Sequence, residues 1–216
     1  MVGYMIKAVI FDMDGVLLDT ESICDKTWEL AAKKMNVVTS SDIVNECRGT
    51  NKEDSLRIIK RILGQDFDAE GFMALTSEYF HQIEFSSGIP VMPFAKEILE
   101  YLRPKYKLAL ASSTHRTAVT RQLTNAGLIS YFNTITTGDQ VVHSKPDPEI
   151  YRMACESIGV PPEECIAIED SPNGIKSAHA AGLSVIMIPD RIAPTPEVTA
   201  LCCNVFEHLD GVKKVL

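Results

Sequence analysis

Two carboxylates separated by one residue follow an apolar run near the start of the chain. Asp12 and Asp14 come directly after residues 8–11, which are all hydrophobic, and Gly15 comes next. Side chains on a strand alternate between faces, so a strand here would send both carboxylates to the same side. Like charges held this close repel each other, so the pair indicates a cation, a shared proton, or both. Taken alone, the motif is explained equally well by a strand that ends in a polar turn.

The later part of the chain alternates apolar strands with helices. Strands are predicted at residues 108–111, 132–136, 166–168 and 185–188, and helices at 94–102, 118–126, 147–159 and 172–181. The third of these helices is predicted to have Asp147 as its N-cap. Continuous apolar strands that alternate with helices predict a parallel sheet covered on both faces. The fold class is therefore α/β, a three-layer Rossmann-like parallel sheet core.

Polar clusters stand at the ends of three predicted strands. Ser112 and Ser113 follow the strand at 108–111, and Glu169 and Asp170 follow the strand at 166–168. Ligands of such sheets bind at the carboxyl ends of the strands, where these clusters and the Asp12 motif would meet. This convergence favours a functional site over a set of unrelated turns and helix caps.

Residues 20–86 differ in character, because apolar residues there recur with helical spacing. Helices are expected around residues 28–35, 56–63 and 72–83, each with one moderately apolar face, and a polar loop at 48–52. The pattern predicts a small helical module inserted into the α/β core. The predicted domains are 1–19 with 87–216 for the core and 20–86 for the module.

Composition narrows the class of protein further. The net charge of the 216 residues is −8, with no basic stripe, which argues against a nucleic-acid partner. No apolar run is long enough for a membrane span, and the first residues lack the features of a signal peptide. Six scattered cysteines without C-x-x-C spacing are typical of reduced thiols. We expect a cytoplasmic protein without a membrane partner, as a monomer or weak homo-oligomer.

Four motifs in this order resemble those of the haloacid dehalogenase-like hydrolases. They are Asp12-x-Asp14-Gly15, Ser112, Lys145-Pro146 and Glu169-Asp170-Ser171-x-Asn173-Gly174. The helical module is similar to the cap of the branch that contains β-phosphoglucomutase and phosphatases of small metabolites. The resemblance covers almost the whole chain and implies a Rossmann-like core with a helical cap.

The resemblance implies phosphoryl transfer, and the residues suit that chemistry. Asp12 is the predicted nucleophile that forms an aspartyl-phosphate, and Asp14 the predicted general acid and base. Mg²⁺ is the expected cofactor, held by Asp12 and Asp170 with Glu169 nearby, and the family adds the Asp14 carbonyl. Phosphate oxygens would be held by Ser112, Ser113 and Lys145.

Substrate choice is expected to depend on the cap and on the rim of the site. Arg48, Gly49 and Lys52 of the cap and Arg116 of the core are candidate substrate-binding residues, although a solvated helix–helix loop explains the first three equally well. The mutase branch carries a histidine four residues after its equivalent of Thr20, where this chain has Cys24. That difference favours hydrolysis by water over mutase action.

The predicted function is Mg²⁺-dependent hydrolysis of a small phosphorylated metabolite, either a sugar phosphate or a nucleotide-like compound. One alternative is a β-phosphoglucomutase-like phosphohexomutase. Another, from a different class, is a phospho-acceptor signalling domain, since receiver domains also combine an Asp, a Ser or Thr and a Lys at strand ends. Such domains need no acid like Asp14 and carry no helical lid.

Overall fold

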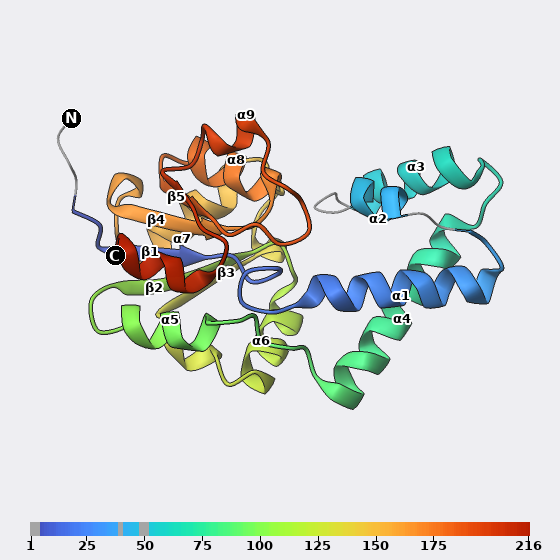
Figure 1. The fold of residues 1–216 in the computed structure, drawn as a ribbon, viewed down its shortest axis with the longest axis horizontal. Coiled ribbons are helices and arrows are strands. Elements are labelled where there is room, and N and C mark those ends of the chain that lie inside the picture. The colour runs from blue at the N-terminus through green and yellow to red at the C-terminus, as the bar shows by residue number, and fades with distance from the viewer. Residues whose placement is uncertain (1–4, 39–40, 48–51) are drawn as a thin grey trace. The chain divides into compact units, whose positions relative to one another are not determined.

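A computed structural model describes residues 5–38, 41–47 and 52–216. The chain folds into two compact units, which are described separately (Figure 1). One consists of Met1–Asp19 with Pro90–Leu216, and the other of Thr20–Ile89. No helix in the described parts of the chain combines the length and the hydrophobicity needed to cross a bilayer.

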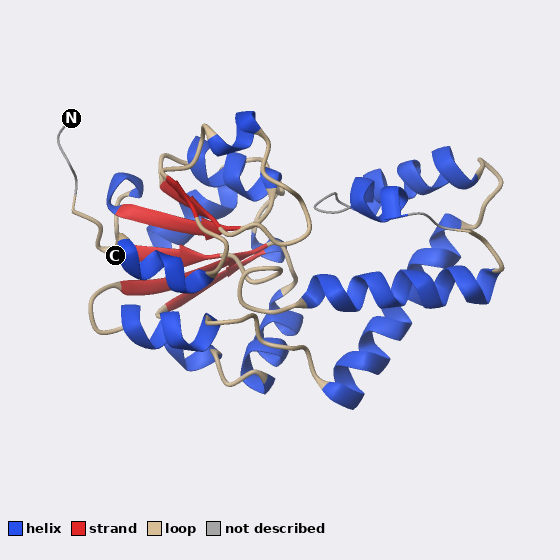
Figure 2. Ribbon diagram, viewed as in Figure 1, coloured by secondary structure: helices blue, strands red, loops and turns tan. Residues whose placement is uncertain are grey.

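The first unit contains a six-stranded parallel sheet in the order β3-β2-β1-β4-β5-β6 (Figure 2). Its strands are β1 (Ala8–Phe11), β2 (Lys107–Ser112), β3 (Thr134–Thr137), β4 (Cys165–Glu169), β5 (Ser184–Met187) and β6 (Asn204–Val205). The central strand β1 is flanked by β2 and β4, with Phe11 opposite Leu110 and Ile168. From β1 the chain adds β2 and β3 on one side, and then adds β4, β5 and β6 on the other side of β1. The predicted parallel α/β sheet is confirmed, although the two-residue β6 was not predicted.

Helices cover both faces of this sheet. The longer ones are α5 (Ala95–Leu102), α6 (Arg116–Asn125), α7 (Glu149–Ile158) and α8 (Pro172–Ala180). Shorter turns are α9 (Pro196–Thr199), η1 (Ile129–Tyr131), η2 (Gly138–Gln140), η3 (Pro162–Glu164) and η4 (Leu209–Lys214). Right-handed crossovers explain the arrangement, because a change in the direction of strand addition moves the connecting helices to the opposite face. Accordingly α7 packs with α8, and α5 with η4.

The N-terminus of α7 differs from the prediction. Its N-cap is Pro148, so the prediction that Asp147 would be the N-cap was wrong by one residue. The Asp147 side chain still accepts a hydrogen bond from the Glu149 amide at 2.9 Å, and so satisfies one of the free amides at the helix start.

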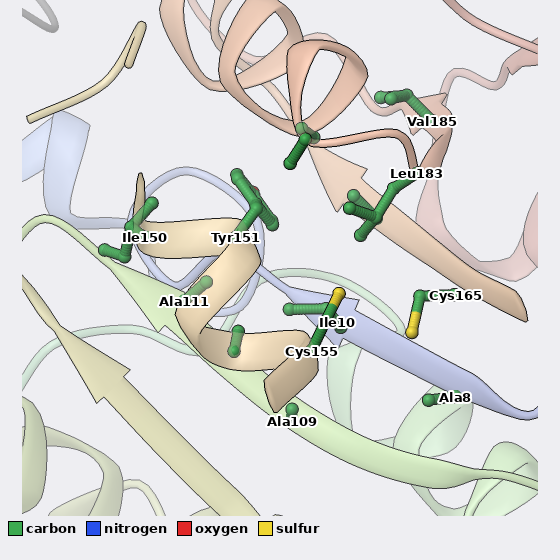
Figure 3. Close-up of a cluster of buried hydrophobic side chains, with 14 of the residues drawn as sticks. Ala8, Ile10, Ala109, Ala111, Ile150, Tyr151, Cys155, Cys165, Leu183 and Val185 are labelled. Atoms are coloured by element: carbon green, nitrogen blue, oxygen red, sulfur yellow. The ribbon is translucent and has the colours of Figure 1, made fainter. Parts of the chain in front are cut away.

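A buried cluster joins the sheet to α7 and α8 (Figure 3). The strands contribute small side chains here, among them Ala109 and Ala111, beside the larger Ile10. Small residues on the strands leave room for a bulky side chain from the helix, and Tyr151 fills it with no exposed surface. The ring of Tyr151 is therefore fixed directly below the carboxyl ends of the strands.

The turn after β1 is held by its own backbone. The Gly15 amide donates to the Leu18 carbonyl at 2.9 Å, and Gly15 has a φ of +75°, which favours glycine. Leu18 also forms an antiparallel β-bridge with Val91, next to the point where the chain returns to this unit at Pro90. Asp14 therefore lies in a fixed turn and not on the strand itself.

The second unit is entirely helical in its described residues. It contains α1 (Thr20–Met35), α2 (Ser41–Cys47), α3 (Lys52–Leu63) and α4 (Ala69–Ser87). Its core includes an edge-to-face pair of Trp28 and Phe72, with ring centroids 5.1 Å apart. The short α2 was not predicted, since its seven residues hold only three apolar residues, Ile43, Val44 and Cys47, too few to establish a helical period.

Candidate active site

The carboxyl ends of three neighbouring strands bring the polar clusters together. In the sheet β1 lies between β2 and β4, and the register places the end of β1 level with theirs. Asp12 therefore emerges between Ser112 of β2 and Glu169 of β4. All three are buried polar residues, in a region where unpartnered charges would be costly.

Lys145 is the cation of this site. Its ammonium lies 2.5 Å from Asp12 Oδ1, 2.7 Å from Glu169 Oε1 and 3.1 Å from the Ala111 carbonyl oxygen. Its side chain is only 8% exposed. Burial alone lowers the pKa of a lysine, but the charges of Asp12 and Glu169 more than offset this and raise the pKa of Lys145 above its usual value. Lys145 is therefore a fixed positive charge.

Glu169 is held by donors on both carboxylate oxygens. Its Oε1 accepts the Tyr151 hydroxyl at 2.8 Å as well as the Lys145 ammonium, and its Oε2 accepts the Ser171 hydroxyl at 3.1 Å. Burial and the adjacent carboxylate raise the pKa of Tyr151 well above its usual value, so the hydroxyl keeps its proton. Gly174 packs so closely that a Cβ there would clash with the Glu169 carboxylate. Glu169 thus has one fixed position.

Tyr151 was not among the predicted site residues. In the sequence it occupies an apolar position of a helix that faces the sheet, and such a residue reads as part of the core. Only the fold shows that its hydroxyl reaches the end of β4.

Carboxylates outnumber cations at the centre of the site. Ligand oxygens of Asp12, Glu169 and Asp170 all lie within 4.8 Å of one another. Burial raises the pKa of Asp12 to about 8, although Lys145 opposes the shift, and burial and Glu169 raise the pKa of Asp170 well above its usual value. Three crowded carboxylates beside one ammonium form a set of hard oxygen donors that suits Mg²⁺. Gly15 leaves the space that Asp170 occupies, because a Cβ there would clash with that carboxylate.

Asp14 has a separate set of partners at the end of β2 and just after it. Its Oδ2 accepts the Thr114 hydroxyl at 2.9 Å and the Ser112 hydroxyl at 3.3 Å. The Thr114 amide in turn donates to the Ser112 oxygen at 3.1 Å. Thr114 was not predicted, although the run Ser112-Ser113-Thr114 offered a signal: alternate residues after a strand can share a face. The two aspartates are therefore bound by different groups, a lysine for one and hydroxyls for the other.

Ser113 and Arg116 are the remaining predicted site residues of the core. Ser113 is exposed, and its carbonyl packs so tightly against Gly138 that a Cβ on the glycine would clash. The Arg116 guanidinium donates to the Ile135 carbonyl at 2.5 Å and to Gln140 Oε1 at 2.7 Å. Arg116 thus anchors the segment after β3, and none of its hydrogen bonds joins it to the carboxylate cluster.

The candidate residues of the cap are only partly covered by the structure. Arg48 and Gly49 lie outside the described residues. Lys52 is the first residue of α3, and its side chain also lies outside what is described.

Comparisons with known proteins agree with this geometry. Residues 9–188 match the model of a family described as haloacid dehalogenase-like hydrolase. The phosphorylated carbohydrates phosphatase of Thermotoga maritima is 35% identical over 83% of each chain. A probable pseudouridine-5'-phosphatase of Drosophila melanogaster is 31% identical over 84% of this chain and 80% of its own. A crystal structure of a putative β-phosphoglucomutase from Thermotoga maritima superposes with a TM-score of 0.79 at 31% identity, over 98% of this chain and 100% of the other. The chain belongs to the haloacid dehalogenase-like hydrolase family.

Proposed function

We propose that this chain is a Mg²⁺-dependent phosphatase that hydrolyses a small phosphorylated metabolite through an aspartyl-phosphate on Asp12. The observation that carries the proposal is the contrast between two aspartates two residues apart. Asp12 is buried against Lys145, and Asp14 accepts hydrogen bonds from Ser112 and Thr114. One carboxylate is thus placed as a nucleophile and the other as a group that can exchange a proton.

In the first step an oxygen of Asp12 attacks phosphorus, and the bond from phosphorus to the leaving alkoxide breaks. Asp14, protonated, donates its proton to that alkoxide. In the second step Asp14, now ionised, takes a proton from water while the water oxygen attacks the phosphorus of the aspartyl-phosphate. Phosphate leaves, and Asp12 regains its carboxylate.

The negative charge of the transferred phosphoryl group would be balanced by residues at the carboxyl ends of the strands. We assign the phosphate oxygens to the Lys145 ammonium, the Ser112 hydroxyl and the Ser113 amide, since Lys145 contacts Asp12, Ser112 ends the neighbouring strand β2, and Ser113 follows it. Asp12 and Asp170 would hold Mg²⁺, with the Asp14 carbonyl as a further ligand. Glu169 is already engaged by Tyr151 and Lys145 and would contribute chiefly its charge. Bound Mg²⁺ would supply positive charge to the phosphoryl oxygens.

Relatives support the enzyme class. Both relatives described above are named phosphatases, one of phosphorylated carbohydrates and one of pseudouridine-5'-phosphate. Accordingly the chain is a phosphoric monoester hydrolase, as the sequence predicts. The hydrolase family also argues against the phospho-acceptor signalling alternative. We propose sugar phosphates or nucleotide-like monophosphates as substrates, and the helical unit 20–89 as the cap that selects among them.

Mutase action is the second candidate, because one solved structure of similar fold is titled a putative β-phosphoglucomutase. Cys24, on α1, stands where the mutase branch has a histidine. A mutase must protect its aspartyl-phosphate from water until the sugar intermediate has turned around. Without that histidine we expect water to attack the aspartyl-phosphate before the sugar intermediate has turned around.

Product analysis distinguishes the two functions. A phosphate-release screen over sugar phosphates, nucleotides and pseudonucleotides is expected to identify at least one substrate that is hydrolysed with Mg²⁺. With β-glucose 1-phosphate, free phosphate and glucose 6-phosphate should be measured in the same sample. We expect phosphate release to exceed glucose 6-phosphate formation. Faster formation of glucose 6-phosphate would make the chain a mutase, and no release from any substrate would contradict the phosphatase.

The variant Asp14→Asn tests the proton-transfer role. Because an amide can neither donate nor accept the required proton, we expect steady-state phosphate release to fall by about 10²–10⁴-fold. With p-nitrophenyl phosphate the leaving group needs no proton, so a rapid burst of about one p-nitrophenol per enzyme should precede the slow phase. A sugar phosphate should give no burst. Unchanged steady-state turnover in the variant would remove Asp14 from the mechanism.

A further inference from the structure

A cavity outside the carboxylate cluster lies at the opposite edge of the sheet. Its volume is about 570 Å³, within the range of small-molecule pockets. Three segments form it, residues 5–7, 103–107 and 130–133. They lead into β1, β2 and β3, which are neighbours in the sheet, so the cavity spans the amino ends of these strands (Figure 1). The catalytic residues lie at the carboxyl ends of the same sheet.

The cavity is strongly cationic. Lys7, Arg103, Lys105 and Lys107 line it, and none of its lining residues is an Asp or Glu, in a chain whose net charge is −8. Lys7 is paired with Glu164 at 2.8 Å, and the Lys107 ammonium donates to a backbone carbonyl at 3.1 Å. Within the described part of the chain, Arg103 and Lys105 make neither an ion pair nor a side-chain hydrogen bond. Three positive charges are therefore left without a neutralising carboxylate.

Aromatic rings stand beside these cations. Tyr106, Tyr131 and Phe132 also line the cavity. The Arg103 guanidinium carbon lies 5.7 Å from the centre of the Tyr131 ring, and the Tyr131 hydroxyl donates to Glu100 at 3.0 Å. Phe132 is packed edge-on against the core residue Phe11, with ring centroids 6.3 Å apart. These contacts fix two rings at the wall, where a planar group could stack on them.

Helix capping explains only part of this arrangement. Arg103 and Lys105 follow the C-terminus of α5, where cations offset the negative end of the helix dipole. That role requires neither a cavity nor aromatic rings. Lys107, the first residue of the adjoining strand β2, likewise donates to the carbonyl of Ile158, the last residue of α7.

We propose that this cavity binds a small anionic ligand that carries a planar ring, the chemical class of nucleoside phosphates. The phosphate groups would contact Arg103, Lys105 and Lys107, and the ring would stack against Tyr131 or Phe132. The ligand would act as an effector and not as the substrate, because the site lies across the sheet from Asp12. Binding here does not depend on the proposed catalytic mechanism.

ADP is the probe for the test, without added divalent cations, on the full chain. Titration calorimetry should show binding, and pyrophosphate, which lacks the ring, and adenosine, which lacks the charge, should each bind more weakly. In ¹⁵N–¹H NMR spectra the amide signals of residues 103, 105–107 and 130–133 should shift, and those of Ser112 and Thr114 should not. Shifts confined to Ser112 and Thr114 would place ADP in the catalytic site and overturn the proposal.

The double variant R103E/K105E should weaken ADP binding roughly tenfold or more, because two charge-assisted contacts are reversed. Its matched control is K96E/K176E, which makes the same change in net charge at two exposed lysines outside the cavity. The control should bind ADP within about twofold of the unmodified chain. No binding of ADP at millimolar concentration, equal loss in both double variants, or pyrophosphate binding as tight as ADP would each overturn the proposal.

Discussion

Replacing Asp12 with asparagine is expected to lower phosphatase turnover by roughly 10⁵-fold or more. An amide oxygen is a poor nucleophile toward phosphorus, and the amide also lacks the charge needed to bind a hard cation. The change is isosteric, so the packing of the turn after β1 should survive. The measurement is phosphate release with the best substrate of the screen, at saturating Mg²⁺.

The reason for so large an effect lies in how few groups can replace Asp12. It is 6% exposed, and its Oδ1 lies 2.5 Å from the Lys145 ammonium. Among the described carboxylates of the cluster, Glu169 is held on both oxygens by Lys145, Tyr151 and Ser171. Asp14 accepts hydrogen bonds from the hydroxyls of Ser112 and Thr114, and proton transfer is its proposed role. No neighbouring carboxylate among these is placed to attack in its stead.

Asp210→Asn is the matched control, since Asp210 is an exposed aspartate in η4, away from the strand ends. It should keep the full rate, and both variants should give the circular dichroism spectrum of the unmodified chain. Asp12→Asn with more than a few per cent of normal turnover would contradict the aspartyl-phosphate mechanism. Samples should be checked by mass spectrometry, because deamidation would restore the aspartate.

Much of the fold could be predicted because the strands β1, β2, β4 and β5 are buried on both faces. A run such as residues 8–11 then contains only apolar residues, and the polar residues that follow it mark its end. The edge strand β6 has two residues of intermediate exposure, Asn204 and Val205, and so carries no such pattern. The helix α2 has only seven residues and is placed by the packing of its neighbours, which sequence spacing does not record.

Apart from Lys145, which the family resemblance supplied, the site could be predicted only where its residues stand at strand ends. Asp12, Ser112 and Glu169 follow apolar runs, so their convergence follows from the parallel sheet. Tyr151 enters the site from within α7, and its role depends on the small Ala109 and Ala111 beneath it. Long-range packing of this kind leaves no local signal.

The sequence alone also did not show how the positive and negative charges balance at the site. Lys145 lies in the loop before α7, and proximity in the fold alone shows that it contacts both Asp12 and Glu169. One ammonium against three carboxylates leaves the cluster with excess negative charge. That excess of negative charge is the physical reason to expect that turnover depends on a divalent cation.

Removal of divalent cations with EDTA is expected to lower turnover by roughly 10³-fold or more, and added Mg²⁺ should restore it. Without a cation the phosphate would approach three carboxylates compensated by Lys145 alone. Ca²⁺ should restore much less activity, because it is larger and prefers more ligands than Mg²⁺. Full activity after exhaustive dialysis against EDTA would contradict a metal-dependent mechanism.

Two variants show where the cation binds, by a measurement that does not depend on catalysis. Mg²⁺ should raise the melting temperature of the unmodified chain by a few degrees, since it binds the folded state. Asp170→Asn should abolish this shift by removing a ligand of the buried cluster. Glu149→Gln is the control, because His143, Asp147 and Glu149 form a second group with ligand atoms within 4.8 Å of one another. Glu149 already accepts the amides of Val142 and His143, at 3.0 and 2.8 Å, so its carboxylate is engaged in holding the loop. We expect Glu149→Gln to keep the Mg²⁺ shift, and the reverse result would move the metal from the strand ends to this loop.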